Sequence, residues 1–464
     1  ELRCTKFLSF LFSYIVILIS YKKLKMRPLL LFIFLLSPFI LFPQTFQHQT
    51  ILSTNSNGNE MVSPFAGGMN APQFSEIDLD NDGDLDLYAF DRIGDVHMTF
   101  LKDVKGDEVK YRYAPQFISG FPNCTEWVLL RDYDADNTPD LFTYSGKLGV
   151  KGIRVFKGKY VNGKIQFGEL NLNQGFDFNV LTFEMNGILD EIFVAKSDYP
   201  AIEDVDFDGD LDILTYNSLG TYVQFYQNQA VENGYPLDSL IFILKDDCWG
   251  KFLESSDSDF IVLGDNIDDC PEYNPPNIHP GSTLLTYDEN GDGLVEILIG
   301  DNSNSHLAKL TNGGTPETAF MTEIDTLFPS SDISVEIDFF VTPFILDVDD
   351  DGLKDLIVSP NWKGPVENYH VGWFYKNVGD QKEYIFEYQQ SDWLIDEMFD
   401  FGSYAAPAFA DVNGDGLTDI VVGNETFYVP NLETDPRLIL ILNIGSETTP
   451  NFQIADYNWL NFNQ

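Results

Sequence analysis

Basic side chains are scarce in this sequence of 464 residues. It has 27 Lys and Arg against 73 Asp and Glu, so its formal net charge is −46. A chain this acidic repels a phosphate backbone, which excludes nucleic-acid binding as its function. It also differs from disordered acidic proteins, because 44% of its residues are hydrophobic and 14% are aromatic. The acidic residues therefore belong to a folded protein.

Catalytic motifs are missing as well. The five histidines have no metal-ligand spacing, and we find no G-x-S-x-G motif, phosphate loop or G-x-G-x-x-G followed by a helix. Paired carboxylates occur throughout, so they do not single out a general acid and base. We predict that the protein is not an enzyme. His97 and His370 lie beside strand-like residues, and we expect both to be partly buried.

Cysteine is rare, with four residues and no zinc-type spacing. Cys248 and Cys270 bracket one acidic, loop-like stretch, and a disulfide closing a loop of that size would contribute roughly 3 kcal/mol to stability. We predict this disulfide. Cys4 belongs to the N-terminal segment, which leaves Cys124 as a buried free thiol.

A secretory signal peptide is predicted at residues 26–45. This segment begins with Met and Arg and continues as the apolar run Leu29–Phe42, which has the length and charged start of such a signal. We expect cleavage within residues 43–47, and an uncleaved anchor is the alternative. The remaining chain, residues 46–464, is then secreted or attached to the cell surface.

Residues 1–25 precede this signal and contain a second apolar run, Phe7–Tyr21. We interpret residues 1–25 as an untranslated or leader extension. A membrane hairpin made of both apolar runs is the less favoured alternative, because each run is shorter than the roughly 20 residues that span a bilayer.

The residues that are abundant favour strands and turns over long helices. There are 35 Gly, 23 Pro and 39 Phe but only 7 Met. The predicted fold class is therefore all-β.

One nine-residue pattern, Asp-x-Asp/Asn-x-Asp-Gly-x-x-Asp/Glu, occurs six times. Successive copies start 54, 72, 84, 59 and 64 residues apart. Side chains at positions 1, 3, 5 and 9 and the backbone carbonyl at position 7 can supply oxygen ligands. The residues at positions 1, 3, 5, 7 and 9 are Asp78, Asp80, Asp82, Asp84 and Asp86 in loop 1; Asp132, Asp134, Asp136, Thr138 and Asp140 in loop 2; Asp204, Asp206, Asp208, Asp210 and Asp212 in loop 3; Asp288, Asn290, Asp292, Leu294 and Glu296 in loop 4; Asp347, Asp349, Asp351, Leu353 and Asp355 in loop 5; and Asp411, Asn413, Asp415, Leu417 and Asp419 in loop 6.

An oxygen-only ligand set indicates a hard cation, and calcium accepts such a cage more readily than magnesium does. We predict up to six structural calcium sites. Loop 2 is the weakest of them, because Asn137 replaces Gly and Pro139 stands at position 8. An EF-hand is excluded, since position 12 is Ala, Thr, Ile or Val in all six copies. A solvated Asp-rich turn is the alternative for a single copy.

Each loop is entered from a short apolar segment and left through a β-rich one, as at Leu284–Leu285 and Val295–Ile299. Pro200, Pro343 and Pro407 stand four residues before the first Asp of their copies, where they exclude a continuing helix. Repeats of several short antiparallel strands bury their faces best in a β-propeller. We predict this fold for residues 46–464.

These units resemble the FG-GAP or VCBS repeats of integrin α-subunit propellers and their bacterial relatives. The resemblance covers roughly residues 60–464 and is most specific at Ala410–Gly423, with Phe65–Gly68 as a looser echo. It implies calcium in the Asp loops and about seven blades. Because six units are visible, we expect the last blade to be missing and the strands near residues 48–75 to help close the ring.

Two segments, Asn70–Asp78 and Cys248–Phe252, resemble secreted Gram-negative proteins exported by type IX secretion. That resemblance implies a C-terminal sorting domain, which we do not see in this sequence.

The resemblance implies an adhesion or protein-interaction module with an unknown extracellular protein or glycan as its partner. A lectin-like propeller is the alternative, and an extracellular glycan-active enzyme is a third. Trp249, Trp362 and Trp393 lie in polar, loop-like surroundings and are candidates for a binding surface, whereas we expect Trp127 and Trp373 in the core.

Overall fold

The computed structural model describes residues 51–463, except residues 55–59, 107, 148, 173–178, 255–260, 273–280, 365–366 and 430–433. The chain divides into the units Glu1–Thr50 and Ile51–Gln464. The predicted leader extension and signal peptide, residues 1–25 and 26–45, lie outside the described residues. Within the described part of the chain, no helix has the length and hydropathy needed to span a lipid bilayer.

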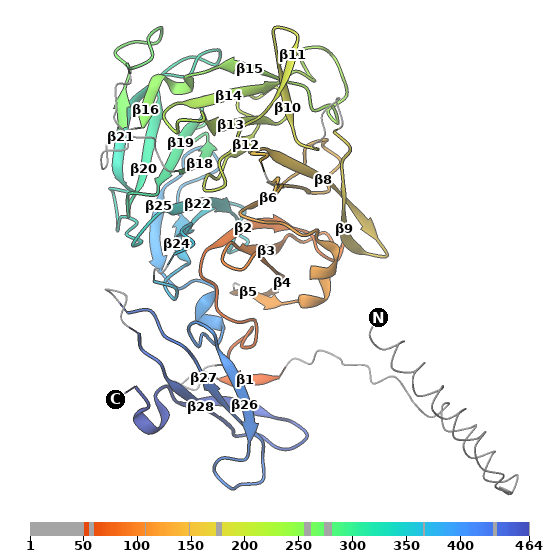
Figure 1. Cartoon of the computed structure of the whole chain (residues 1–464), viewed down its shortest axis with the longest axis vertical. Coiled ribbons are helices and arrows are strands. Elements are labelled where there is room, and N and C mark those ends of the chain that lie inside the picture. Colours follow the sequence, from red (N-terminus) through yellow and green to blue (C-terminus); the bar gives the residue numbers. More distant parts are fainter. Residues whose placement is uncertain are drawn as a thin grey trace, which may run out of the picture. The chain divides into compact units, whose positions relative to one another are not determined.

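The fold is all-β, as predicted, and is built from six sheets of one plan (Figure 1). In each sheet four antiparallel strands follow one another in chain order. The first three sheets contain β2 (Pro72–Ile77), β3 (Asp86–Asp91), β4 (Val96–Lys105) and β5 (Glu108–Tyr113); β6 (Val128–Arg131), β7 (Asp140–Tyr144), β8 (Ile153–Val161) and β9 (Lys164–Glu169); and β12 (Ala201–Glu203), β13 (Asp212–Tyr216), β14 (Val223–Asn228) and β15 (Phe242–Asp246).

The next three sheets repeat the plan. They contain β18 (Ser282–Tyr287), β19 (Glu296–Asp301), β20 (Leu307–Asn312) and β21 (Met321–Phe328); β22 (Val341–Leu346), β23 (Asp355–Pro360), β24 (Trp373–Asn377) and β25 (Phe386–Gln390); and β26 (Ala406–Ala410), β27 (Asp419–Gly423), β28 (Leu438–Asn443) and β29 (Asn451–Asp456).

Smaller elements extend or connect these sheets. The third sheet gains β10 (Thr182–Met185) and β11 (Ile188–Glu191), and the sixth gains β1 (Leu52–Thr54). A separate pair comprises β16 (Phe252–Glu254) and β17 (Ile261–Leu263). The short 3₁₀ turns are η2 (Pro115–Gly120), η3 (Trp249–Lys251), η4 (Ile395–Glu397) and η6 (Trp459–Asn461).

Burial decreases from the first two strands of a sheet to its fourth. Every residue of β18, β19 and β23 is buried, whereas the fourth strand β21 is buried only at its two ends. Strands buried on both faces read as continuous apolar runs, which explains the Leu-, Ile- and Val-rich segments after each Asp loop. The first strands therefore mark the interior of the molecule.

The first five sheets contact one another in a cycle. In Figure 1 their first strands, β2, β6, β12, β18 and β22, lie toward the middle of the group. The last contact joins the fifth sheet back to the first, an arrangement consistent with a β-propeller. One hydrogen bond at each junction in turn is Val128 to Gln73 (3.0 Å), Arg131 to Glu203 (2.8 Å), Leu284 to Tyr199 (2.9 Å), Thr283 to Val341 (2.8 Å) and Ser359 to Pro72 (2.5 Å).

The sixth sheet differs from the other five. All five residues of its first strand, β26, are exposed, whereas the corresponding strands of the other sheets are mostly buried. The segment leading into this sheet contacts the rest of the unit at Phe399, whose backbone N–H donates to Pro64 O at 3.0 Å. The loop after β27 does so at Tyr428, whose Oη donates to Asp338 Oδ2 at 2.5 Å. The N-terminal strand β1 pairs in parallel with β29, so the start of the described chain does add to the last sheet.

The cysteines follow the prediction. Cys248 and Cys270 form a disulfide with their Cα atoms 6.2 Å apart. Cys124 is a buried free thiol, and burial raises its pKa to about 12. A thiol with so high a pKa is inert at neutral pH, which agrees with a packing role.

Candidate metal-binding loops

All six Asp loops occupy the same place in their sheets, between the first and the second strand. Position 9 is always the first residue of the second strand, as Asp86 is in β3 and Asp419 is in β27. A strand rather than a helix follows each loop, so the exclusion of an EF-hand is confirmed.

Position 1 closes each loop by accepting backbone hydrogen bonds. In loop 1, Asp78 Oδ1 accepts from the N–H of Asn81 at 2.6 Å and Asp78 Oδ2 accepts from the N–H of Gly83 at 3.0 Å. The bond from position 6 to position 1 occurs in all six loops at 2.7–3.0 Å. A second bond, from the N–H of position 7 to the carboxylate of position 5, measures 2.8–3.1 Å throughout. The nine-residue pattern thus specifies one backbone shape.

Two positions of the loop adopt left-handed backbone conformations. At position 6 the φ angles run from 63° at Asn137 to 104° at Gly209, so Asn137 does take the glycine conformation, as expected. Position 4 also has positive φ, between 57° and 80°, in every loop. The pattern did not reveal this, because position 4 is Gly in only two copies and is Ala135 and Phe207 in two others.

Position 9 has a structural role that the sequence did not indicate. Its carboxylate is buried and accepts one backbone N–H from position 2 and one from the third strand. In loop 1 these donors are Leu79 (2.9 Å) and Lys102 (2.8 Å) to Asp86. The same pair of bonds is present in all six sheets at 2.7–3.4 Å. Position 9 therefore ties the loop to the body of its sheet.

Burial raises the pKa of these position-9 carboxyls, although the backbone hydrogen bonds oppose the shift. The pKa is about 6 for Asp86, about 7 for Asp140, Glu296 and Asp355, and about 9 for Asp212. Neighbouring loop carboxylates raise these values further in several copies, as Asp206 does for Asp212. Without a cation, part of this buried charge is therefore costly near neutral pH.

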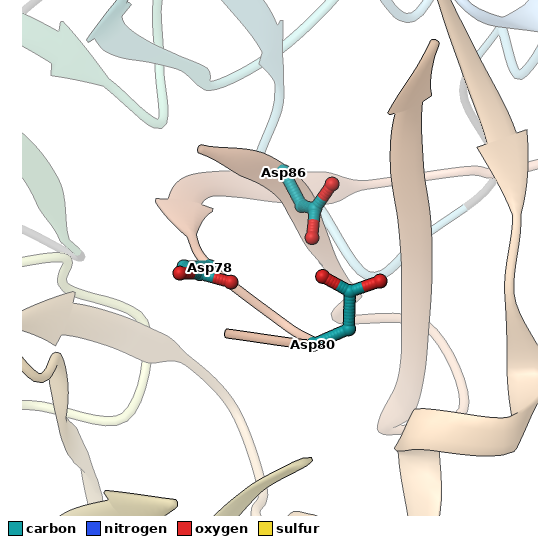
Figure 2. A group of neighbouring side chains, drawn as sticks. All are labelled: Asp78, Asp80 and Asp86. Carbon is teal, nitrogen blue, oxygen red and sulfur yellow. The ribbon is translucent and has the colours of Figure 1, made fainter. Parts of the chain in front are cut away.

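Position 3 carries the clearest indication of a missing partner. Asp80 Oδ1 is buried and has no hydrogen-bond partner, and the same holds for one oxygen of Asp134, Asp206 and Asp349. In loop 1, carboxylate oxygens of Asp78, Asp80 and Asp86 lie within 4.8 Å of one another, and Figure 2 shows the carboxylates of Asp80 and Asp86 pointing toward each other. A buried carboxylate oxygen without a donor fits a hard cation as its partner.

Carboxylate clusters of this size occur in loops 1, 2, 3 and 5 among the described residues. Loops 4 and 6 have an amide at position 3 instead; Asn413 Nδ2 donates to Asp415 Oδ2 at 2.9 Å. Loop 3 has an additional carboxylate, because Glu232 comes within 4.8 Å of Asp206 and Asp208. Glu232 was not predicted from the sequence, because it lies beyond β14 and only the fold brings it to the loop.

A cavity of about 740 Å³ lies where the first strands end at the Asp loops. Four of its charged side chains form two ion pairs: Lys354 Nζ lies 2.9 Å from Glu76 Oε2, and Arg131 pairs with Glu203. Such pairs neutralise one another and join neighbouring sheets.

Two of the three tryptophans predicted to lie at a binding surface are buried. Trp249 and Trp393 are only 3% and 9% exposed, so their assignment to a binding surface was wrong. The ring of Trp393 packs at 5.5 Å from that of Phe74, which lies in the first strand of the first sheet. Trp362 is 41% exposed and remains a candidate, and Trp127 is fully buried, as predicted.

The two histidines also differ. His97 is half-buried, as expected, with Nδ1 2.7 Å from Tyr88 Oη and Nε2 2.9 Å from Pro122 O. Burial lowers its pKa. His370 is exposed, so the expectation of partial burial was wrong there; it lies beside Glu367, in the loop between β23 and β24.

Comparison with known proteins identifies one segment of the chain. Residues 347–422, from loop 5 into β27, match the model of the FG-GAP-like repeat. This agrees with the resemblance seen in the sequence and is consistent with a propeller. A search of curated proteins gives no match.

Two solved structures are remotely similar. One is an Agrocybe aegerita lectin, described by its recognition of non-reducing terminal N-acetylglucosamine; it is 14% identical, the match covers 85% of this chain and 83% of the lectin, and the TM-score is 0.29. The other is a chain of a RAG complex with one melted and one unmelted RSS; it is 10% identical, with coverages of 82% and 97% and a TM-score of 0.32. TM-scores this low carry no argument about function.

Proposed function

We propose that this protein is a secreted or cell-surface β-propeller that binds calcium in its Asp loops and serves as an adhesion or protein-interaction module. The FG-GAP-like repeat at residues 347–422 supports a protein-interaction propeller. The observation that carries the calcium assignment is the buried position-3 oxygen without a partner in loops 1 and 3, whose backbone shape all six loops share.

The ring of this propeller contains five sheets, and the sixth stands outside it. Two observations support this count in place of about seven blades. The fifth sheet bonds directly to the first through Ser359 and Pro72, and the first strand of the sixth sheet is exposed along its length. A ring closed by five sheets has no remaining gap on that side, so a further sheet must attach elsewhere.

Calcium is favoured over magnesium because the loop offers many oxygen ligands within one short turn. Magnesium keeps its waters and requires tight octahedral geometry. For affinities of 0.1–1 mM, typical of extracellular modules, about 1 mM calcium stabilises the fold by roughly 0.5–1.5 kcal/mol per filled site. Several such sites together approach the net stability of a domain.

Thermal unfolding tests this assignment. We expect the melting temperature of the purified protein to rise by several degrees when calcium is titrated into protein treated with EGTA. Magnesium at the same concentration should give a much smaller rise. If calcium leaves the melting temperature unchanged, the loops are solvated turns and the proposed function loses its basis.

The adhesive surface that we propose is formed by the loops between second and third strands, on the face away from the Asp loops. The longest of these in the five-sheet ring joins β23 to β24 and carries Trp362 and Tyr369, which are 41% and 42% exposed. Exposed aromatic side chains on a rigid scaffold are typical anchors of protein interfaces. The disulfide Cys248–Cys270 supports an oxidising, extracellular location.

An array of extracellular-matrix proteins and glycans provides the probe for adhesion. We expect calcium-dependent binding to protein spots, weakened by replacing Trp362 and Tyr369 with Ala. Binding confined to glycan spots would favour a lectin instead. Catalysis is not part of this proposal, because carboxyls with raised pKa values, such as Asp86, are held by backbone N–H groups.

A further inference from the structure

The third strand of every sheet places one side chain beside its Asp loop. This residue immediately precedes the backbone donor to position 9, and the strand register sets it opposite position 9. The side chain at this place differs between sheets. From the first sheet to the sixth, it is Leu101, Lys157, Gln227, Thr311, Lys376 and Leu442.

In loops 2 and 5 this side chain is a lysine, and its ammonium group lies among the loop carboxylates. Lys157 Nζ contacts Asp134 and lies 2.7 Å from Asp136 Oδ2. Lys376 Nζ repeats this geometry: it contacts Asp349 and lies 2.8 Å from Asp351 Oδ2. Each lysine thus bridges the carboxylates at positions 3 and 5, both of which would be ligands of a bound calcium ion.

An ammonium group and a divalent cation repel each other and cannot share the same pair of carboxylates. Calcium binding at loops 2 and 5 would have to expel the lysine and break both of its charge-assisted hydrogen bonds. The other loops carry no such obstacle, because Leu and Thr side chains are uncharged. In loop 3 the amide of Gln227 donates to Asp206 at 2.6 Å and accepts from Gln229 Nε2 at 3.0 Å, but it carries no charge and can rotate to present its oxygen to a cation.

We propose that Lys157 and Lys376 are built-in cations, and that loops 2 and 5 remain free of calcium at concentrations that fill loops 1, 3, 4 and 6. This inference rests on the proposed function, that the unobstructed loops bind calcium. The six loops then fall into two classes, and the nine residues of a loop do not show to which class it belongs. Loop 5 has every residue of the pattern, including Gly352. It differs only through Lys376, a side chain on the third strand of its sheet.

Calcium-binding stoichiometry tests the proposal. Equilibrium dialysis of the whole protein against calcium should give about four ions per chain, because two of the six loops contain a lysine. Lys157→Met and Lys376→Met should each add one ion, and the double variant should add two. The added sites should bind in the range of about 0.1–1 mM that is typical of extracellular modules.

Lys309→Met is the matched control. Lys309 is also a third-strand lysine, and it pairs at 2.6 Å with Glu289, which is position 2 of loop 4 and not one of the predicted ligands. Its removal should leave the stoichiometry unchanged. A gain of calcium in this variant would indicate a general effect of charge and would overturn the proposal.

The outcomes separate the two hypotheses. Six ions bound to the wild-type protein, or folded lysine variants that still bind four, would overturn the role of the lysines while leaving calcium binding intact. No ions bound to the wild-type protein would overturn calcium binding and this inference together.

Chemical labelling of the wild-type protein tests the proposal without any substitution. Limited acetylation followed by peptide mass spectrometry measures the reactivity of Lys157 and Lys376. We expect their labelling rates to be the same in calcium and in EGTA, because their ammonium groups stay in the loops. A several-fold rise in calcium would show that the ion displaces them and would overturn the proposal.

Discussion

Position 9 illustrates how one residue can serve two purposes. Its carboxylate accepts two backbone hydrogen bonds that hold the loop against the third strand, and in loops 1 and 3 it also belongs to the acidic cluster. A carboxylate oxygen has two lone pairs, so hydrogen bonding to the backbone and coordination of an ion are compatible. The hydrogen bonds therefore hold the backbone shape of the loop without an ion.

Replacing Asp86 with Asn should destabilise the protein even in EGTA. The NH₂ group of Asn cannot accept the hydrogen bond that one carboxylate oxygen of Asp86 accepts. One buried backbone N–H would therefore lose its partner, which costs about 1–3 kcal/mol. Urea unfolding at pH 8, above the pKa of about 6 of Asp86, measures this difference. The exposed neighbour Asp84 is the control, since Asp84→Asn should change stability by less than about 0.5 kcal/mol. Equal effects of the two substitutions would contradict the anchoring role.

The raised pKa values predict a specific pH dependence for the cation-free protein. Asp86, Glu296 and Asp212, in the loops without a lysine, have pKa values of about 6, about 7 and about 9 when folded and ordinary values near 4 when unfolded. At pH values between the unfolded and the folded pKa, the folded state holds more protons than the unfolded state, so raising the pH favours unfolding. The free energy of unfolding should therefore fall from pH 5 to pH 8, and calcium should reverse the fall because it binds the ionised carboxylates. A stability that rises over this range would contradict the assignment.

At the scale of elements, the six sheets have the same plan but different surroundings. Among the five sheets that contact one another in a cycle, first strands such as β22 are mostly buried, whereas β26 is exposed at all five residues. Both strands begin their sheets and both contain proline, so their local sequences do not account for the difference. The contacts made by neighbouring sheets determine it.

Hydrogen exchange should reveal this difference. Amides of Ala406–Ala410 should exchange considerably faster than those of Val341–Leu346 in the presence of calcium, because β26 pairs on one side only and packs against no neighbouring sheet. Mass spectrometry of peptides from the two strands provides the measurement. Equal protection would mean that β26 is covered in solution and that the sixth sheet belongs to a closed ring.

At the scale of the whole molecule, Arg92 links distant parts of the unit. Its guanidinium group is buried and donates to the carbonyls of Asn361 and Lys196, each at 2.6 Å, and it lies 3.4 Å from Glu126. These partners come from the fifth sheet and from the loops around the second and third sheets. One side chain from the first sheet thus helps to hold the cycle of sheets together.

Replacing Arg92 with Met should lower the stability by about 1–3 kcal/mol for each of the two carbonyls, of Asn361 and Lys196, that it leaves without this donor. The effect should be visible as a lower melting temperature in both calcium and EGTA. Arg112 provides the control: it pairs with Asp103 on an exposed surface, where an ion pair contributes about 0–1 kcal/mol. A small effect for Arg92→Met would mean that the sheets are held together mainly by their apolar cores.

The sequence by itself determined the features that depend on neighbouring residues. The Asp loops, the strands on either side of them and the left-handed backbone of Asn137 all follow from interactions within about ten residues. Position 1 and position 5 bond to backbone groups inside their own loop, so a repeated pattern is sufficient to predict a repeated shape. The disulfide Cys248–Cys270 was also predictable, because it closes a local loop.

Only the tertiary structure decided which charged side chains from elsewhere in the chain enter the Asp loops. Lys376 and Glu232 reach loops 5 and 3 from other parts of the chain, and the strand register sets the distances that bring them there. Trp393 is another example. Its neighbours in the sequence are polar, but packing against another sheet buries its side chain. Electrostatic contacts and burial depend on proximity in space, and for residues far apart in the chain that proximity is created by the packing of sheets.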